Sequence, residues 1–330
     1  MQTGRLTESI RKRSVLKKIT YRSRQLIGGP AAWEDCARLD VAEQKHMVFC
    51  VDAVSGHLDI LPQKAFYRLA NRVAACGAEP GGILMTLLLP EAAEEICVKQ
   101  IMEQTAGLAS ARRMDILGVH TEVLSTVTQP VLSLTGVGFL APEINVKHSR
   151  VKPGADIVMT KWAGVTGAAE RVITSAGSAE KELCTRFSSD FLEQTGEQFR
   201  YIISMADARI AAEAGAFALH CAGEGGVYEA LWELGEACGS GLAVDVKKIP
   251  IRQETIEICE FFDDNPYTIP SDGVLLAVTE AGGRLAERLT EAGIPAAVIG
   301  STTDERARVV CNGEEKRFLA PRGSSMCRQD

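Results

Sequence analysis

Short apolar segments alternate with longer stretches of helical periodicity along the whole chain, a pattern typical of a mixed α/β fold. In the first half these segments follow the order β-α-β-α-β-β. The predicted strands are residues 46–52, 83–89, 115–123 and 130–140, and the predicted helices are residues 62–76 and 91–112. We therefore expect a sheet with helices packed against it in this half of the chain.

The second half continues the alternation after a charged connector at residues 142–154. Its predicted strands are residues 156–160, 242–246, 274–279, 296–299 and 308–311. Its predicted helices begin at residue 164 and then cover residues 178–200, 207–219, 226–237 and 284–292. A chain of 330 residues exceeds the usual size of one core, so we expect two domains, residues 1–148 and 149–330.

Composition excludes several classes of protein. The formal net charge of −7 disfavours a nucleic-acid-binding protein, because such proteins need a basic surface. The longest apolar run, residues 83–89, is too short to span a bilayer. The ten cysteines form no Cys-x-x-Cys pair, which argues against a zinc ribbon and suits a reducing compartment. We therefore expect a soluble, cytoplasmic protein.

Common catalytic motifs are absent from the sequence. It contains no Gly-Lys dipeptide, no Gly-x-Gly-x-x-Gly, no Gly-x-Ser-x-Gly and no His-Glu-x-x-His. A phosphate loop of the Walker type, the usual dinucleotide fingerprint, a hydrolase nucleophile elbow and a zincin are thus excluded. The chemistry has to reside in less familiar positions.

Polar residues stand near the ends of several predicted elements, and α/β proteins usually bind their ligands at such strand ends. These residues are Glu34, Asp35, Asp52, Asn71, His120, Thr121, Glu122 and the Cys-Ala-Gly-Glu-Gly-Gly run of residues 221–226. Turn, cap or solvated positions explain each of them equally well when it is taken singly. Pattern alone leaves both interpretations open.

The order of the short motifs resembles that of a known family. Cys50-Val51-Asp52 is similar to its Thr-Thr-Asp strand, and Asn71 to Ala78 with Pro80 is similar to its Asn-Asp-Leu-Ala-x-x-Gly-Ala-x-Pro. Further matches are Glu34-Asp35, residues 118–123, residues 152–156, residues 220–226, Lys248-Ile249-Pro250 and Ser271-Asp272-Gly273. The chain thus resembles the PurM-like superfamily of aminoimidazole-ribonucleotide (AIR) synthetase, in particular the AIR synthase-related proteins of the hydrogenase expression/formation (HypE) branch.

The resemblance implies a two-domain fold. A ferredoxin-like N-terminal domain would pair into a β-barrel-like core in a homodimer, and a C-terminal α/β domain would follow it. It also implies that ATP binds with Mg²⁺, that the protein activates an amide or carboxamide oxygen by phosphoryl transfer, and that a maturation protein is a partner. In the hydrogenase branch the acceptor is a carbamoylated cysteine at the C-terminus, which is dehydrated.

The resemblance also assigns residues to the expected site. The implied nucleotide contacts are Asp35, Asp52, Asn71, Arg72, Thr121, Glu122, Gly225 and Gly226. Of these, Asp35, Asp52 and Asn71 are the implied metal ligands, because Mg²⁺ prefers oxygen. His120 and Cys221 are the catalytic candidates, and Cys327, three residues before the last residue, stands close to the place of the family's reactive cysteine.

Several substitutions depart from the family pattern. Arg72 replaces the aspartate that follows Asn71, and Cys221 and Gly223 replace an aspartate and a threonine. Arg72 should weaken metal binding, and it either holds a phosphate directly, forms an ion pair or points to solvent. Three alternatives stay open: a soft metal site of His120, His220, Cys221 and Asp35; a non-catalytic dimeric scaffold; and an inert surface thiol at Cys327.

Overall fold

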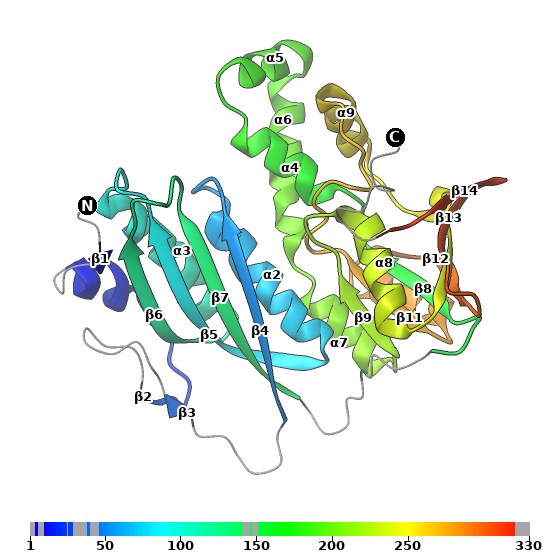
Figure 1. Ribbon diagram of the computed structural model, residues 1–330, viewed down its shortest axis with the longest axis horizontal. Coiled ribbons are helices and arrows are strands. Elements are labelled where there is room, and N and C mark those ends of the chain that lie inside the picture. Colours follow the sequence, from blue (N-terminus) through cyan, green and yellow to red (C-terminus); the bar gives the residue numbers. More distant parts are fainter. Residues whose placement is uncertain are drawn as a thin grey trace. The chain divides into compact units, whose positions relative to one another are not determined.

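The computed structural model describes residues 4–5, 10–24, 26–28, 38–39, 46–140, 146 and 151–320 (Figure 1). The chain divides into two compact units. Unit 1 contains residues 1–74 and 78–142, and unit 2 contains residues 75–77 and 143–330. Each unit has its own sheet, so each is described separately.

Unit 1 is built on a five-stranded sheet with the strand order β1-β6-β5-β7-β4. Its strands are β1 (Gly4–Arg5), β4 (His46–Ser55), β5 (Ala78–Leu89), β6 (Asp115–Val123) and β7 (Val131–Leu140). Its helices are α2 (Leu61–Ala75) and α3 (Glu95–Ala111), and the short strands β2 (Leu26–Gly28) and β3 (Arg38–Leu39) pair separately. The helix α3 connects the parallel strands β5 and β6, whereas the other pairs of this sheet are antiparallel. The predicted order β-α-β-α-β-β is confirmed.

The two faces of this sheet differ. One face packs against α2, where Gly136 and Gly138 of β7 leave room for Leu69 and Val73. The other face carries large apolar side chains that are exposed to solvent, namely Phe49 (65%), Val51 (67%) and Leu84 (38%). The sheet is open, with β1 and β4 at its edges. Among the described residues, one chain thus contributes an open sheet, and the barrel-like core expected of a homodimer needs a second copy.

Unit 2 contains a seven-stranded mixed sheet with the order β14-β13-β10-β12-β8-β11-β9. The strands are β8 (Asp156–Thr160), β9 (Ala218–Cys221), β10 (Gly241–Asp245), β11 (Leu275–Thr279), β12 (Ala296–Thr303), β13 (Arg308–Asn312) and β14 (Glu315–Phe318). The helices are α4 (Val165–Thr174), α5 (Ser178–Arg186), α6 (Ser189–Glu197), α7 (Met205–Glu213), α8 (Gly226–Cys238), α9 (Gln253–Phe262) and α10 (Gly282–Glu291). Buried side chains of α8 and of the strands form its main core. Among the helices of the described residues, none is both long and apolar enough to cross a membrane.

Several elements of unit 2 differ from the prediction, and the helix predicted over residues 178–200 is divided into α5 and α6. The helix predicted over residues 207–219 is wrong at its end, because α7 stops at Glu213 and β9 begins at Ala218. Gly215 has a φ of +80°, a left-handed conformation that ends the helix. Helix α9 and strand β14 were not predicted at all. All four residues of β14 are exposed, so no apolar alternation marks this strand.

A buried ion pair joins three segments of unit 2. Lys161 follows β8, and its ammonium donates hydrogen bonds to the Asp207 carboxylate on α7 and to the Gly273 carbonyl, the latter at 2.9 Å. The Lys161 and Asp207 side chains are only 7% and 3% exposed. Burial lowers the pKa of Lys161, and Asp207 and Cys221 oppose that shift. The φ of +59° at Lys161 is unfavourable for a residue with a side chain, so these contacts hold a strained backbone in place.

Replacing Gly138 by alanine should destabilise unit 1. A Cβ atom at this position would lie 2.3 Å from Cγ1 of Val73, so strand β7 or helix α2 would have to shift. We expect Gly138→Ala to lower the free energy of unfolding in urea by about 1–3 kcal/mol. The control Gly107→Ala on α3 meets no atom within 4 Å, and it should raise stability by up to about 1 kcal/mol. Equal effects of the two substitutions would contradict the proposed packing of α2 on β7.

Replacing Lys161 by methionine should destabilise unit 2, because Asp207 would keep a buried charge without its partner. The expected loss is about 3–5 kcal/mol in urea denaturation, and the double variant Lys161→Met/Asp207→Leu should recover much of it. The matched control is Arg171→Met, whose ion pair with Asp264 has side chains that are 49% and 21% exposed. That control should lose no more than about 1 kcal/mol. A similar loss in both single variants would refute the role given to burial.

Candidate functional site

Asp52 lies inside β4, three residues before the strand ends, rather than at a strand tip as expected. Its side chain points to α2, where Oδ2 lies 3.2 Å from Nε of Arg68 and 3.2 Å from Nη1 of Arg72. The two arginines are four residues apart, so they occupy the same side of the helix. We call Asp52, Arg68 and Arg72 the Asp52 cluster. One carboxylate thus contacts two guanidinium groups.

The exposure of the Asp52 cluster increases along α2. The side chains of Asp52 and Arg68 are 12% and 9% exposed, whereas that of Arg72 is 39% exposed. Of the three roles considered for Arg72, the structure shows the ion pair. Arg72 nevertheless keeps contact with solvent, and a guanidinium group has five N–H donors to share. It can therefore contact a second anion.

Two more polar residues of α2 are buried, and both are close in sequence to Arg68 and Arg72. Lys64, which is 4% exposed, stands one helical turn before Arg68 and extends the spacing of cations to residues 64, 68 and 72. Asn71 is 1% exposed. Sequence reasoning overlooked Lys64 and Arg68, although their spacing of four in a predicted helix was a usable signal. Lys64, Arg68 and Arg72 thus follow the spacing expected of one side of α2.

The described residues do not fit a magnesium ion at Asp52. A cation there would have to compete with two guanidinium groups for one carboxylate, and it would be repelled by both. Within the part of the chain that the structure describes, no group of three or more His, Cys, Asp or Glu residues could hold a metal ion. Asp35, the other expected carboxylate, lies outside the described residues.

The three consecutive residues expected on β6 do not converge. His120 and Glu122 lie on the open face of the sheet, in register with Thr86 and Leu88 of β5, and His120 Nε2 is 3.4 Å from Glu122 Oε2. Thr121 is 3% exposed and points to the opposite face, since successive strand residues alternate. Only Thr121 therefore shares a face with Asp52.

In unit 2, Cys221 ends β9, and its Sγ lies 3.9 Å from the Ser204 hydroxyl. The preceding residue, His220, points away from it and places Nε2 2.7 Å from Oε2 of Glu233 on α8. Because adjacent strand residues face opposite ways, the soft metal site that combined His220 with Cys221 is wrong. Cys221 instead lies in the electrostatic environment of Lys161.

The two expected glycines stand where α8 begins. Gly226 has a φ of +68°, and a Cβ atom there would lie 2.4 Å from the Tyr267 carbonyl oxygen. The close approach of this loop thus explains Gly226 without a ligand. Cys327, like Asp35, lies outside the described residues.

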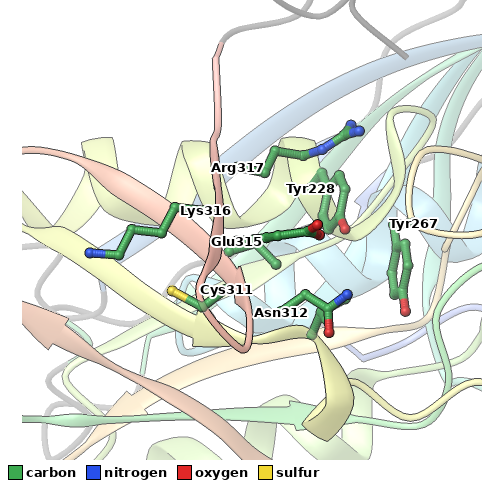
Figure 2. A pocket seen from close by; sticks show the side chains of 9 residues that line it. Tyr228, Tyr267, Cys311, Asn312, Glu315, Lys316 and Arg317 are labelled. Atoms are coloured by element: carbon green, nitrogen blue, oxygen red, sulfur yellow. The ribbon is translucent and has the colours of Figure 1, made fainter.

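Unit 2 also contains a pocket of about 440 Å³ (Figure 2). Its wall includes Tyr228 and Tyr267, whose rings are stacked with centroids 4.9 Å apart, and the Arg317 guanidinium lies 5.8 Å from the Tyr228 ring centre. Burial raises the pKa of Tyr228 to about 12. Glu315 and Asn312 come from the ends of β14 and β13. None of the residues predicted from the sequence lines this pocket.

Two relatives of the chain are a putative hydrogenase expression/formation protein and a carbamoyl dehydratase. It is 26% identical over 322 residues to a putative hydrogenase expression/formation protein of Methanocaldococcus jannaschii, covering 93% of this chain and 90% of that protein. It is also 26% identical over 280 residues to carbamoyl dehydratase HypE of Rhodobacter capsulatus, covering 83% of this chain and 78% of that protein.

Solved structures of similar fold carry related names. The crystal structure of Escherichia coli HypE has a TM-score of 0.78 at 19% identity, covering 98% of this chain and 99% of that one. A HypE structure in complex with ATP has a TM-score of 0.72 at 17% identity, covering 96% and 94%. A HypE–HypF complex has a TM-score of 0.68 at 19% identity, covering 83% and 90%. At such identities the likeness establishes the fold.

Family comparison matches both halves of the chain. Residues 33–140 match the N-terminal domain of AIR synthase related proteins, and residues 152–312 match their C-terminal domain. These two segments span most of the 330 residues and occur in the family's order. The expected α/β fold class is therefore confirmed, and the chain belongs to the family of AIR synthase related proteins.

Proposed function

We propose that this protein binds ATP and uses its γ-phosphoryl group to activate an amide or carboxamide oxygen, in hydrogenase maturation of the HypE type. The observation that carries the proposal is the row of cations Lys64, Arg68 and Arg72 on α2, in a chain with both domains of the family. The relatives named above include a carbamoyl dehydratase, and a protein of the same fold binds ATP.

Phosphoryl transfer of this kind depends on positioning and charge neutralisation more than on covalent catalysis. The amide oxygen attacks the γ-phosphorus while ADP leaves. The nitrogen then gives up its two protons and forms a C≡N bond as the C–O bond breaks and phosphate departs. In our proposal the cations of α2 neutralise the triphosphate. Asp52 positions Arg68 and Arg72 by contacting both guanidinium groups at 3.2 Å.

The remaining residues expected at the site are retained as proposals. Asn71, Thr121, Glu122, Gly225 and Gly226 remain proposed nucleotide contacts, as does Asp35. His120 and Cys221 remain the catalytic candidates, and Cys221 is supported by the buried ammonium of Lys161 in its surroundings. We also retain the domain boundary between residues 148 and 149 as a proposal.

We further propose that the protein is a homodimer whose two copies cover the open face of the unit 1 sheet. Phe49, Val51 and Leu84 lie on this face with 38–67% of their surface exposed, and large exposed apolar groups of this kind favour association. A second sheet on this face would complete the barrel-like core implied by the family. A maturation protein is a further proposed partner, by analogy with the HypE–HypF complex.

The cytoplasm is the proposed compartment. None of the cysteines in the described residues, including the exposed Cys184, forms a disulfide. Free thiols persist in a reducing environment, so this observation supports an intracellular location.

The alternative is a dimeric scaffold that binds nucleotide without turnover. The pairing of Asp52 with two arginines favours it, because the carboxylate is not available as a metal ligand. Single-turnover assays with radiolabelled ATP and a carboxamide acceptor distinguish the two functions. Release of phosphate that depends on the acceptor would exclude the scaffold.

Calorimetric titration with ATP tests the proposed function. Wild-type protein should bind ATP, and Arg72→Ala should weaken binding by about tenfold, the effect of losing one charged hydrogen bond of about 1.4 kcal/mol. The control Lys181→Ala removes a positive charge from an exposed position on α5 and should leave the affinity unchanged. Absence of ATP binding by the wild type would refute the proposal.

Light scattering after size-exclusion chromatography tests the homodimer. Val51→Asp places a charge on the open face of the sheet, so it should convert a dimer into a monomer. The control Phe318→Asp alters another exposed apolar residue, which is 61% exposed on β14 of unit 2, and it should stay dimeric. A dimeric Val51→Asp variant would contradict the proposed interface.

A further inference from the structure

The charged residues at and beside α2 that could balance the charge of a triphosphate differ from the family pattern. Arg72 stands where the resemblance places an aspartate, so one position changes from −1 to +1. The neighbouring acid, Asp52, does not remain available, because Arg68 and Arg72 both lie 3.2 Å from its Oδ2. Of the two carboxylates the family would offer near these positions, one is missing and the other is ion-paired.

The same side of α2 is strongly cationic. Lys64, Arg68 and Arg72 contribute three positive charges, and Asp52 contributes one negative charge. Lys64 and Arg68 are buried or nearly so, where charges are screened less by water and salt. The contact of one carboxylate with two guanidinium groups leaves an excess of positive charge at Asp52, Arg68 and Arg72, which favours an anion and disfavours Mg²⁺.

The geometry of Arg72 suits direct contact with phosphate. It reaches Asp52 through Nη1, and 39% of its side chain remains exposed. A planar guanidinium can contact a carboxylate with one N–H and phosphate oxygens with others, an arrangement that a lysine or a metal ligand does not provide. Asp52 then acts as a positioning residue that fixes the orientation of the Arg72 guanidinium group.

We propose that the triphosphate of the nucleotide is bound directly by Arg72, with Arg68 and Lys64 supporting the positive charge, so that binding needs no divalent cation. This inference rests on the proposed binding of ATP. It replaces the metal bridge expected from the resemblance with a bridge of guanidinium groups held by Asp52. The ligand class is a nucleoside triphosphate or another linear polyphosphate.

Calorimetric titration of the full chain with ATP, in excess EDTA and again in excess Mg²⁺, tests the inference. Wild-type protein should bind in EDTA with a dissociation constant within about threefold of that in Mg²⁺. Inorganic tripolyphosphate in EDTA should compete with ATP, because the contacts are to phosphate. Binding of the wild type that appears only with Mg²⁺ would overturn the inference and leave the proposed function standing.

Two substitutions separate charge from metal binding. Arg72→Asp restores the carboxylate of the family, so it should lose at least tenfold in affinity in EDTA and recover affinity when Mg²⁺ is added. Arg72→Gln removes the charge without adding a ligand, so it should be weak in both buffers. Lys181→Asp on α5 is the control with the same change of charge, and it should resemble the wild type.

The variants also distinguish the ways in which the inference can fail. Thermal denaturation identifies any variant that does not fold, and Arg72→Gln then carries the test, because it adds no charge beside Asp52. If Arg72→Gln binds ATP in EDTA as tightly as the wild type, Arg72 does not hold the phosphates and the inference is wrong. If the wild type binds ATP in neither buffer, the proposed function itself fails.

Discussion

The contact of one carboxylate with two guanidinium groups, between β4 and α2, limits what Asp52 can bind. Asp52 is 12% exposed and Arg68 9% exposed, so this ion pair lies largely away from water. Removing one partner from such a site is costly, because the other keeps an unbalanced charge. The arginines therefore depend on Asp52 for their position, and Asp52 is not free to hold a metal ion.

Alternation along the strands assigns different roles to the two faces of the unit 1 sheet. The face toward α2 holds Asp52 and Thr121, whereas the open face holds His120, Glu122 and exposed apolar side chains. A nucleotide bound by α2 and a second copy packed on the open face would thus use opposite sides of the same strands. Unit 2 separates His220 from Cys221 by the same rule.

The periodicity of apolar residues predicted most of the fold, because burial against one neighbour leaves a clear period in the sequence. Strand β6 and strand β8 were predicted with their observed limits, residues 115–123 and 156–160. Strand β9 was missed because it is only four residues long and follows α7 after a short turn at Gly215. Strand β14 was missed because an exposed edge strand needs no apolar residues.

The site was less predictable than the fold. The resemblance drew attention to Asp52 and Arg72, but their contact depends on how β4 is placed against α2, which no local pattern records. Arg68 and the Lys161–Asp207 pair were overlooked for the same reason, since each joins residues distant in the sequence. Spacing alone could have suggested Lys64, Arg68 and Arg72 as one row of cations, yet not the contact of Arg68 and Arg72 with Asp52.

The most direct measurement is a crystal structure of the protein with a non-hydrolysable ATP analogue, grown in excess Mg²⁺. Our account predicts that Arg72 donates hydrogen bonds to phosphate oxygens while Asp52 keeps its contacts with Arg68 and Arg72. A magnesium ion coordinated by Asp52, with Arg72 turned away from the phosphates, would contradict it.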